Sequence, residues 1–121
     1  MEKIHMANVE GIFANILWEH APLTTKEMIK LAQDALGWKR TTTYTVLKKL
    51  CGRGIFALND RIVTALISKS EYHAIRSEQF VRDDFQNSLP AFLAAFTSRQ
   101  KVSAKDLEEI KKLVDSLEDK V

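Results

Sequence analysis

The stretch GWKRTTTYTVLKKLCGRG, residues 37–54, carries the most distinctive pattern in the chain. Between positions 38 and 53 it holds five basic residues and no acidic residue, a local charge of +5 in a chain whose net charge is +2. Its apolar residues recur at helical spacing, which predicts a helix over about 40–52. The residues expected to face inward are Thr43, Val46, Leu47 and Leu50. The opposite face is then polar and basic, and it suits a negatively charged partner.

Two amphipathic helices are predicted before this stretch, over about 9–20 and 25–36. Asn8 is a candidate N-cap for the first helix, because its short polar side chain can accept a hydrogen bond from an exposed amide. The segment TTKE predicts a capping box at the start of the second helix, formed by Thr24 and Glu27. The chain therefore begins with three consecutive helices.

After residue 54 the hydrophobic pattern changes from a helical period to alternation. The segments IFAL and RIVTALI predict two β-strands, over about 55–58 and 62–67. Asn59 and Asp60 are expected to form the tight turn between them, with Arg61 at the tip of the hairpin. Three helices followed by a hairpin define a winged helix-turn-helix, a mostly α fold with a small β-hairpin.

The carboxylate-free face of the helix over 40–52 fits double-stranded DNA. A helix in the major groove must present small polar groups to base edges and cations to phosphates, whereas carboxylates are repelled. Threonine supplies both a hydroxyl and a methyl group that can contact thymine. The residues expected to contact DNA are Lys39, Arg40, Thr41, Thr42, Tyr44, Thr45, Lys48, Lys49, Arg53 and, in the hairpin, Arg61.

A second class of function is compatible with the same fold. The winged domain could dock on a partner protein through its hairpin, in an interaction module whose helical tail dimerises. The basic segment separates the two hypotheses, since a surface that docks on protein has no need to exclude carboxylates. We therefore favour DNA over a protein partner.

Composition limits the class of protein, its location and the chemistry that it can carry. The chain has 121 residues, of which 45% are hydrophobic and 28% charged, as in an ordinary globular protein. No apolar run is long enough to span a bilayer and no signal-peptide core is visible, so the cytoplasm is the expected location. His5, His20 and His73 are isolated and Cys51 is the single cysteine, so we expect no metal site, cofactor or catalytic group.

The second part of the chain differs in charge and pattern. Residues 1–69 carry a net charge of +4 and residues 70–121 a net charge of −2. We predict a winged-helix DNA-binding domain over 1–69 and an all-helical dimerisation domain over 70–121. The predicted helices of the latter span about 70–85, 88–97 and 104–119. The last one carries apolar residues at heptad spacing, and we call Leu107, Ile110, Val114 and Leu117 its seam. Val121 continues the same spacing. The residues expected to form a homodimer interface are Phe92, Phe96, Leu107, Ile110, Val114 and Leu117.

Three segments carry a resemblance to a known family: ILWEHAPLTTKEMIKLA, GWKRTTTYTVLKKLCGRG and SLPAFLAAF. Over about residues 8–119 the chain resembles the penicillinase-repressor family, which includes the methicillin-resistance repressor and copper-responsive repressors of Gram-positive bacteria. The resemblance implies a bacterial, homodimeric winged-helix repressor of transcription. It also implies palindromic operators, often with TACA/TGTA half-sites, and a helical C-terminal domain that forms the dimer.

The resemblance also implies how such repressors respond to signals. In the β-lactam-responsive members, a membrane sensor pathway leads to proteolysis at an Asn-Phe bond in the dimerisation domain. The matching pair here is Ala95-Phe96, so the phenylalanine of that site is present and the asparagine is not. The copper-responsive members bind metal through C-terminal Cys-x-Cys motifs. This chain ends in LEDKV without a cysteine, so copper sensing by that route is not expected.

Overall fold

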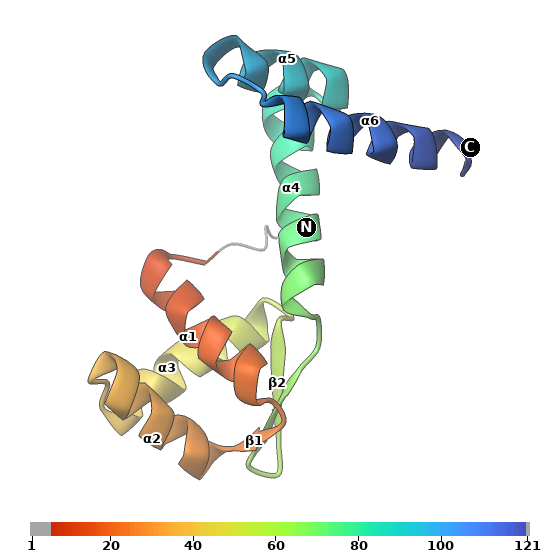
Figure 1. The fold of residues 1–121 in the computed structure, drawn as a ribbon. Coiled ribbons are helices and arrows are strands. Elements are labelled where there is room, and N and C mark those ends of the chain that lie inside the picture. Colours follow the sequence, from red (N-terminus) through yellow and green to blue (C-terminus); the bar gives the residue numbers. More distant parts are fainter. Residues whose placement is uncertain (1–5, 121) are drawn as a thin grey trace. The chain divides into compact units, whose positions relative to one another are not determined.

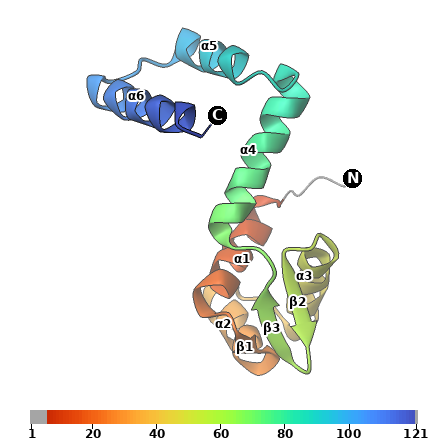
Figure 2. The same cartoon turned by 90° about the vertical axis from the view of Figure 1, so that its right-hand side faces the viewer.

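The computed structural model describes residues 6–120 as a mostly helical chain with one small sheet (Figures 1 and 2). His5 and Val121 therefore lie outside the described residues. The elements in order are α1 (Asn8–His20), β1 (Leu23–Thr24), α2 (Thr25–Leu36), α3 (Arg40–Gly52), β2 (Phe56–Asn59), β3 (Ile62–Ala65), α4 (Lys69–Phe85), α5 (Leu89–Arg99) and α6 (Ala104–Glu118). They form two compact units, an N-terminal unit, Met1–Gln79, and a C-terminal unit, Phe80–Val121.

Local signals set the ends of the first helices. The N-cap of α1 is Ala7, so the expectation for Asn8 was wrong: the Glu10 carboxylate accepts a bond from the Ala7 amide at 2.9 Å. At α2 the predicted cap is confirmed, since the Glu27 amide donates to Thr24 Oγ1 at 3.1 Å. The Glu27 carboxylate accepts a hydrogen bond from the Thr24 hydroxyl and not from the Thr24 amide. Gly37, with φ +68°, ends α2 in a left-handed conformation that suits glycine.

The sheet has three antiparallel strands in the order β1-β3-β2, so the predicted hairpin is present with an additional strand. In this strand Leu23 pairs with Val63. The hairpin turn lies one residue later than expected. Asp60 and Arg61 are its central residues, both with positive φ, because Asn59 is the last paired residue of β2.

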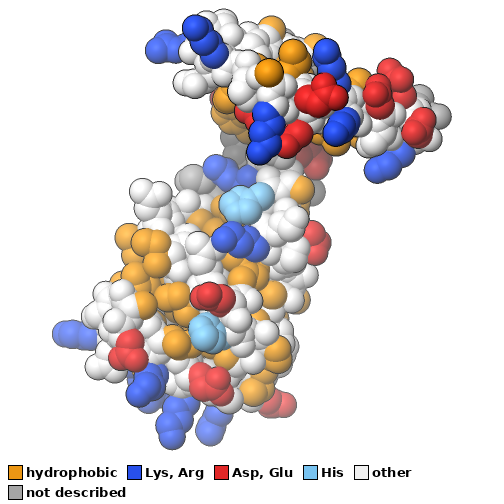
Figure 3. All heavy atoms as spheres, in the orientation of Figure 1, with side chains coloured by type: hydrophobic (Ala, Val, Ile, Leu, Met, Phe, Trp, Pro, Cys, Tyr) orange, Lys and Arg blue, Asp and Glu red, His pale blue; other side chains and the backbone are white. Residues whose placement is uncertain are grey.

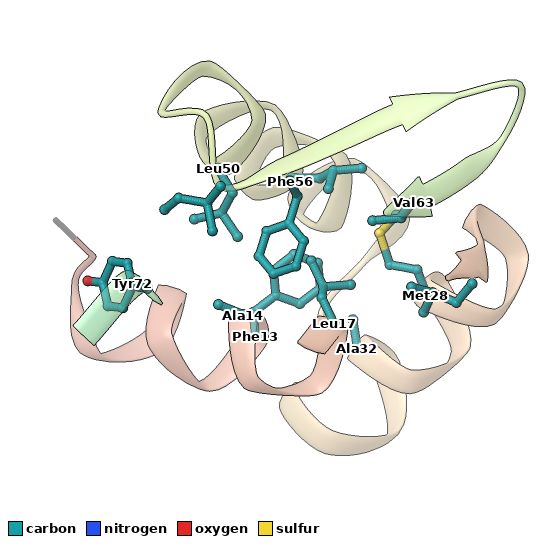
Figure 4. Packing of buried hydrophobic residues seen from close by; sticks show 12 residues of the cluster. Phe13, Ala14, Leu17, Met28, Ala32, Leu50, Phe56, Val63 and Tyr72 are labelled. Atoms are coloured by element: carbon teal, nitrogen blue, oxygen red, sulfur yellow. The ribbon is translucent and has the colours of Figure 1, made fainter. Parts of the chain in front are cut away.

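The core of the N-terminal unit lies between the three helices and the sheet (Figure 4). Each element contributes at least one side chain that is almost fully buried. The largest of these are Phe13, Leu17, Met28, Leu47, Leu50, Ile55, Phe56 and Val63. Since α3 buries Thr43, Leu47 and Leu50 in this core, its opposite face is held towards solvent. Val46, also expected inside, is half-buried.

The division into compact units falls between Gln79 and Phe80, whereas the charge and pattern of the sequence predict a division after residue 69. Tyr72 accounts for the difference. Its ring is 5% exposed and lies 5.6 Å from the ring of Trp18, so the start of α4 packs on the first unit. The indole of Trp18 also donates to the Ile67 carbonyl at 3.0 Å. The functional division after residue 69 stays a prediction.

The C-terminal unit is held by an aromatic cluster rather than by a closed core. Rings of the end of α4 and of α5 pack edge to face, with centroids 5.5 to 5.9 Å apart, and the rings of Phe92 and Phe96 within α5 are tilted at a distance of 6.3 Å. The cluster consists of Phe80, Phe85, Phe92 and Phe96. No residue of α5 or α6 is buried among those described. The helix α6 starts as predicted, where Ser103 Oγ accepts from the Asp106 amide at 3.0 Å.

Candidate nucleic-acid interface

The exposed face of α3 gathers most of the residues predicted to contact DNA. Seven of the predicted residues are exposed on α3 or at its entry. They are Lys39, Arg40, Thr41, Thr42, Thr45, Lys48 and Lys49. Tyr44 is half-buried, Arg53 follows the helix, and Arg61 lies in the hairpin. Trp38 supports this entry, because its ring packs 5.1 Å from that of Phe13 in the core.

A shallow cleft of about 360 Å³ joins this face to α2 and the hairpin tip. It is lined by Thr25, Lys26, Ile29, Arg40, Tyr44 and Arg61. All three charged residues among these described ones are cations. Figure 3 shows Lys and Arg side chains projecting from the end of the unit that carries α2 and the hairpin. The cleft is therefore suited to an anion.

Two contacts fix the geometry of this cleft. The Thr25 amide donates to the Arg61 carbonyl at 2.9 Å, which ties the hairpin tip to the first residue of α2. The guanidinium of Arg40 lies 5.7 Å from the centre of the Tyr44 ring, within the range of a cation–π interaction. Lys26 was missing from the predicted site. A single lysine in a helix gives no sign of a binding site in the sequence. Its position in the same cleft as Arg61 depends on the fold.

The threonines of α3 differ in what their hydroxyl groups do. The buried Thr43 donates to the Lys39 carbonyl at 3.0 Å, and the exposed Thr45 donates to the Thr41 carbonyl at 2.8 Å. Within the described part of the chain, the hydroxyl of Thr42 has no hydrogen-bond partner. Thr42 can therefore offer both a donor and an acceptor to a ligand, whereas Thr45 offers an acceptor and a methyl group.

Arg53 is set apart from the other predicted contact residues by an internal ion pair. Its Nη1 lies 3.1 Å from Oε1 of Glu10, and both side chains are mostly buried. The pKa of Glu10 lies below its ordinary value, because the carboxylate accepts from the Ala7 amide and from Arg53 and lies near Lys49. This pair ties the start of α1 to the end of α3, which indicates a structural role for Arg53.

Replacing Glu10 with glutamine should lower the free energy of unfolding by about 1 kcal/mol at neutral pH, because the ion pair with Arg53 is lost. A depressed carboxyl pKa stabilises the fold above the unfolded-state value, and this contribution disappears as pH falls through the folded-state pKa. The difference between the two proteins should therefore shrink below about pH 4. Urea unfolding at neutral and acidic pH measures it, with Glu19→Gln as the control on the same helix. A difference that is constant with pH would exclude the carboxylate charge as its cause.

Cys51 carries the single thiol of the sequence. The thiol is half-buried at the end of α3, and burial raises its pKa, which keeps it protonated at neutral pH. Among the helices of residues 6–120, none has the length and apolar character needed to cross a membrane.

A winged helix whose exposed third helix is basic and free of carboxylates defines the class of this molecule as a DNA-binding regulator of transcription. The model of the penicillinase repressor family matches residues 6–116, so the chain belongs to that family of transcriptional repressors. The resemblance found in the sequence is thereby confirmed.

One curated protein and one solved structure are among those similar to this chain. The penicillinase repressor of Bacillus licheniformis is 24% identical over 122 residues, which cover 95% of this chain and 94% of that protein. The solution structure of the monomeric form of Bacillus licheniformis BlaI, in complex with the blaP half-operator, matches with a TM-score of 0.50 and 24% identity. That match covers 59% of this chain and 92% of the other, and it supports the winged-helix fold.

Proposed function

We propose that this protein represses transcription in the cytoplasm as a homodimer bound to a palindromic DNA operator. The observation that carries the proposal is the exposed face of α3, where cations and threonines are gathered without a carboxylate. Family membership and the half-operator bound by the similar BlaI structure support the same partner. A protein-docking role for the winged domain would leave the basic cleft without a purpose.

The cations and the threonines have different roles in this proposal. Phosphate contacts fix the position of a protein on DNA, and contacts to base edges give specificity. We assign phosphate contacts to Lys26, Lys39, Arg40, Lys48, Lys49 and Arg61. Base contacts are assigned to Thr41, Thr42, Thr45 and the edge of Tyr44. Arg53 keeps its structural role with Glu10, since its guanidinium is already paired.

Replacing Lys49 or Arg61 with alanine should weaken binding to all DNA sequences alike. Each change should reduce the slope of log affinity against log salt by about one, because one fewer counterion is released. Alanine at position 61 keeps a Cβ, so the strain of the positive φ at that position is unchanged. Fluorescence anisotropy with a random duplex at several salt concentrations measures the slope.

The control for this pair is Lys69→Ala, an exposed cation at the first turn of α4. It should leave both the affinity and the slope unchanged. If Lys49→Ala and Arg61→Ala behave as this control does, the docking surface proposed here is wrong.

The C-terminal unit supplies the dimer contact in this proposal. A cleft of about 410 Å³ lies between α5 and α6, with Phe92, Phe96 and Ile110 in its lining. The seam residues of α6 are all exposed, among them Leu107 at 46% and Leu117 at 45%. Apolar surface gathered in this way is uncommon on a monomer and marks an interaction site. In this proposal the C-terminal unit of a second copy of the chain covers this apolar surface.

Release from the operator is proposed to follow proteolysis in this unit, through the membrane sensor pathway that the resemblance implies. The bond in question joins Ala95 and Phe96, two exposed residues inside α5. A protease must bind this bond in an extended chain, so α5 has to unfold locally before cleavage. Cleavage there would separate the dimer contact from the DNA-binding unit.

A further inference from the structure

We propose that Thr45 recognises an A·T base pair, with its hydroxyl oxygen as hydrogen-bond acceptor and its methyl group against the thymine methyl. This inference rests on the DNA-binding function proposed above. It adds which base pair one residue selects, and by which atoms. The observation behind it is the hydrogen bond between Thr45 Oγ1 and the Thr41 carbonyl, at 2.8 Å.

This bond determines what the hydroxyl of Thr45 has left to offer. A carbonyl oxygen can only accept, so the single hydroxyl hydrogen of Thr45 points at Thr41 and is not available to DNA. The oxygen keeps a lone pair, and the residue is exposed on the predicted contact face. Donating to a base would require the side chain to rotate and break the bond within the helix. Thr45 is therefore an acceptor when it meets the groove.

The base edges of the major groove respond differently to such a group. Adenine N6 and cytosine N4 are the donors there, whereas guanine presents acceptors at N7 and O6. An acceptor-only hydroxyl can therefore bond adenine or cytosine and cannot bond guanine. Thymine adds a methyl group, which the methyl of Thr45 can contact. An A·T pair carries both the donor and the methyl, and a C·G pair carries only the donor.

The other threonines of α3 show why this applies to Thr45 in particular. Thr43 makes the same kind of bond to the carbonyl four residues before it, but its side chain is fully buried in the core. Thr42 is exposed, and its hydroxyl is unbonded among residues 6–120, so it can donate as well as accept. Of these three, Thr45 alone combines exposure with a committed hydrogen.

The experiment uses the full chain and an operator selected from random duplexes by the protein itself. Two variants divide the side chain of Thr45 into its parts: Thr45→Val keeps the shape and removes the hydroxyl, and Thr45→Ser keeps the hydroxyl and removes the methyl. Two base substitutions remove single groups from the DNA in the same way. Purine in place of adenine removes the N6 amino group, and deoxyuridine in place of thymine removes the methyl group. Dissociation constants are measured for every combination at each A·T pair of one half-site.

At one A·T pair we expect the changes to be coupled. Thr45→Val and the purine substitution should each weaken binding by about tenfold, and together by little more than either alone. Thr45→Ser and deoxyuridine should show the same non-additivity at that pair. Thr42→Val is the matched control and should add fully to both DNA changes there.

Two outcomes would overturn the inference: full additivity at every A·T pair, or unchanged affinity of Thr45→Val. A failure of the proposed function looks different. In that case the full chain selects no duplex, and Lys49→Ala leaves binding to random DNA unchanged.

Discussion

Removal of residues 80–121 is expected to leave a folded monomer that binds a palindromic operator at least about a hundredfold more weakly than the full chain. One α3 covers only a few base pairs, and joining two copies makes the second contact intramolecular. The truncated chain ends after Gln79 and so keeps Tyr72 in the core of its compact unit. Analytical sedimentation, circular dichroism and operator titration measure its mass, helicity and affinity.

A substitution in the full chain provides the matched test of the same claim. Val114→Asp places a charge on the exposed seam of α6 and should also produce a weakly binding monomer. Ser116→Asp adds the same charge to the exposed polar face of that helix and should leave the dimer intact. A truncated protein that stays dimeric, or that binds the palindrome as tightly as the full chain, would place dimerisation elsewhere.

Replacing Phe56 with alanine should lower the free energy of unfolding of the N-terminal unit by about 3–5 kcal/mol. The side chain is fully buried, and its ring lies 5.3 Å from that of Trp18, so β2 is joined through it to α1. The substitution leaves a cavity that the surrounding helices can fill only in part. Urea unfolding followed by tryptophan fluorescence reports this unit, because Trp18 and Trp38 both belong to it.

Leu58→Ala is the control on the same strand, because its side chain is 39% exposed. We expect it to change the free energy of unfolding by no more than about 0.5 kcal/mol. Equal losses from the two variants would contradict the packing described for the core.

The helices could be predicted from the sequence because their signals are local. The capping residue Thr24 and the left-handed Gly37 lie at the two ends of α2, and the apolar spacing of α3 distinguishes its buried from its exposed face. Strand β1 could not be predicted in this way. It has two residues, and it exists because Leu23 pairs with Val63, forty positions further along the chain.

The candidate site shows the same division between local and distant causes. The exposed face of α3 follows from helical periodicity, so the exposure of its threonines and lysines could be predicted. Lys26 was missed because the bond between Thr25 and Arg61 brings it to the cleft, and only the folded chain contains that bond. The ion pair of Arg53 could not be predicted either, since its partner Glu10 belongs to another helix.

The most direct test of the proposed interface is a titration of the isotope-labelled full chain with its operator duplex, followed by amide chemical shifts in NMR. The account predicts that the largest shifts map to the exposed face of α3, including Thr42 and Thr45, to the start of α2 at Lys26 and to the hairpin tip at Arg61. Shifts concentrated instead in the groove between α1 and α4, around His73, with α3 unchanged, would contradict it.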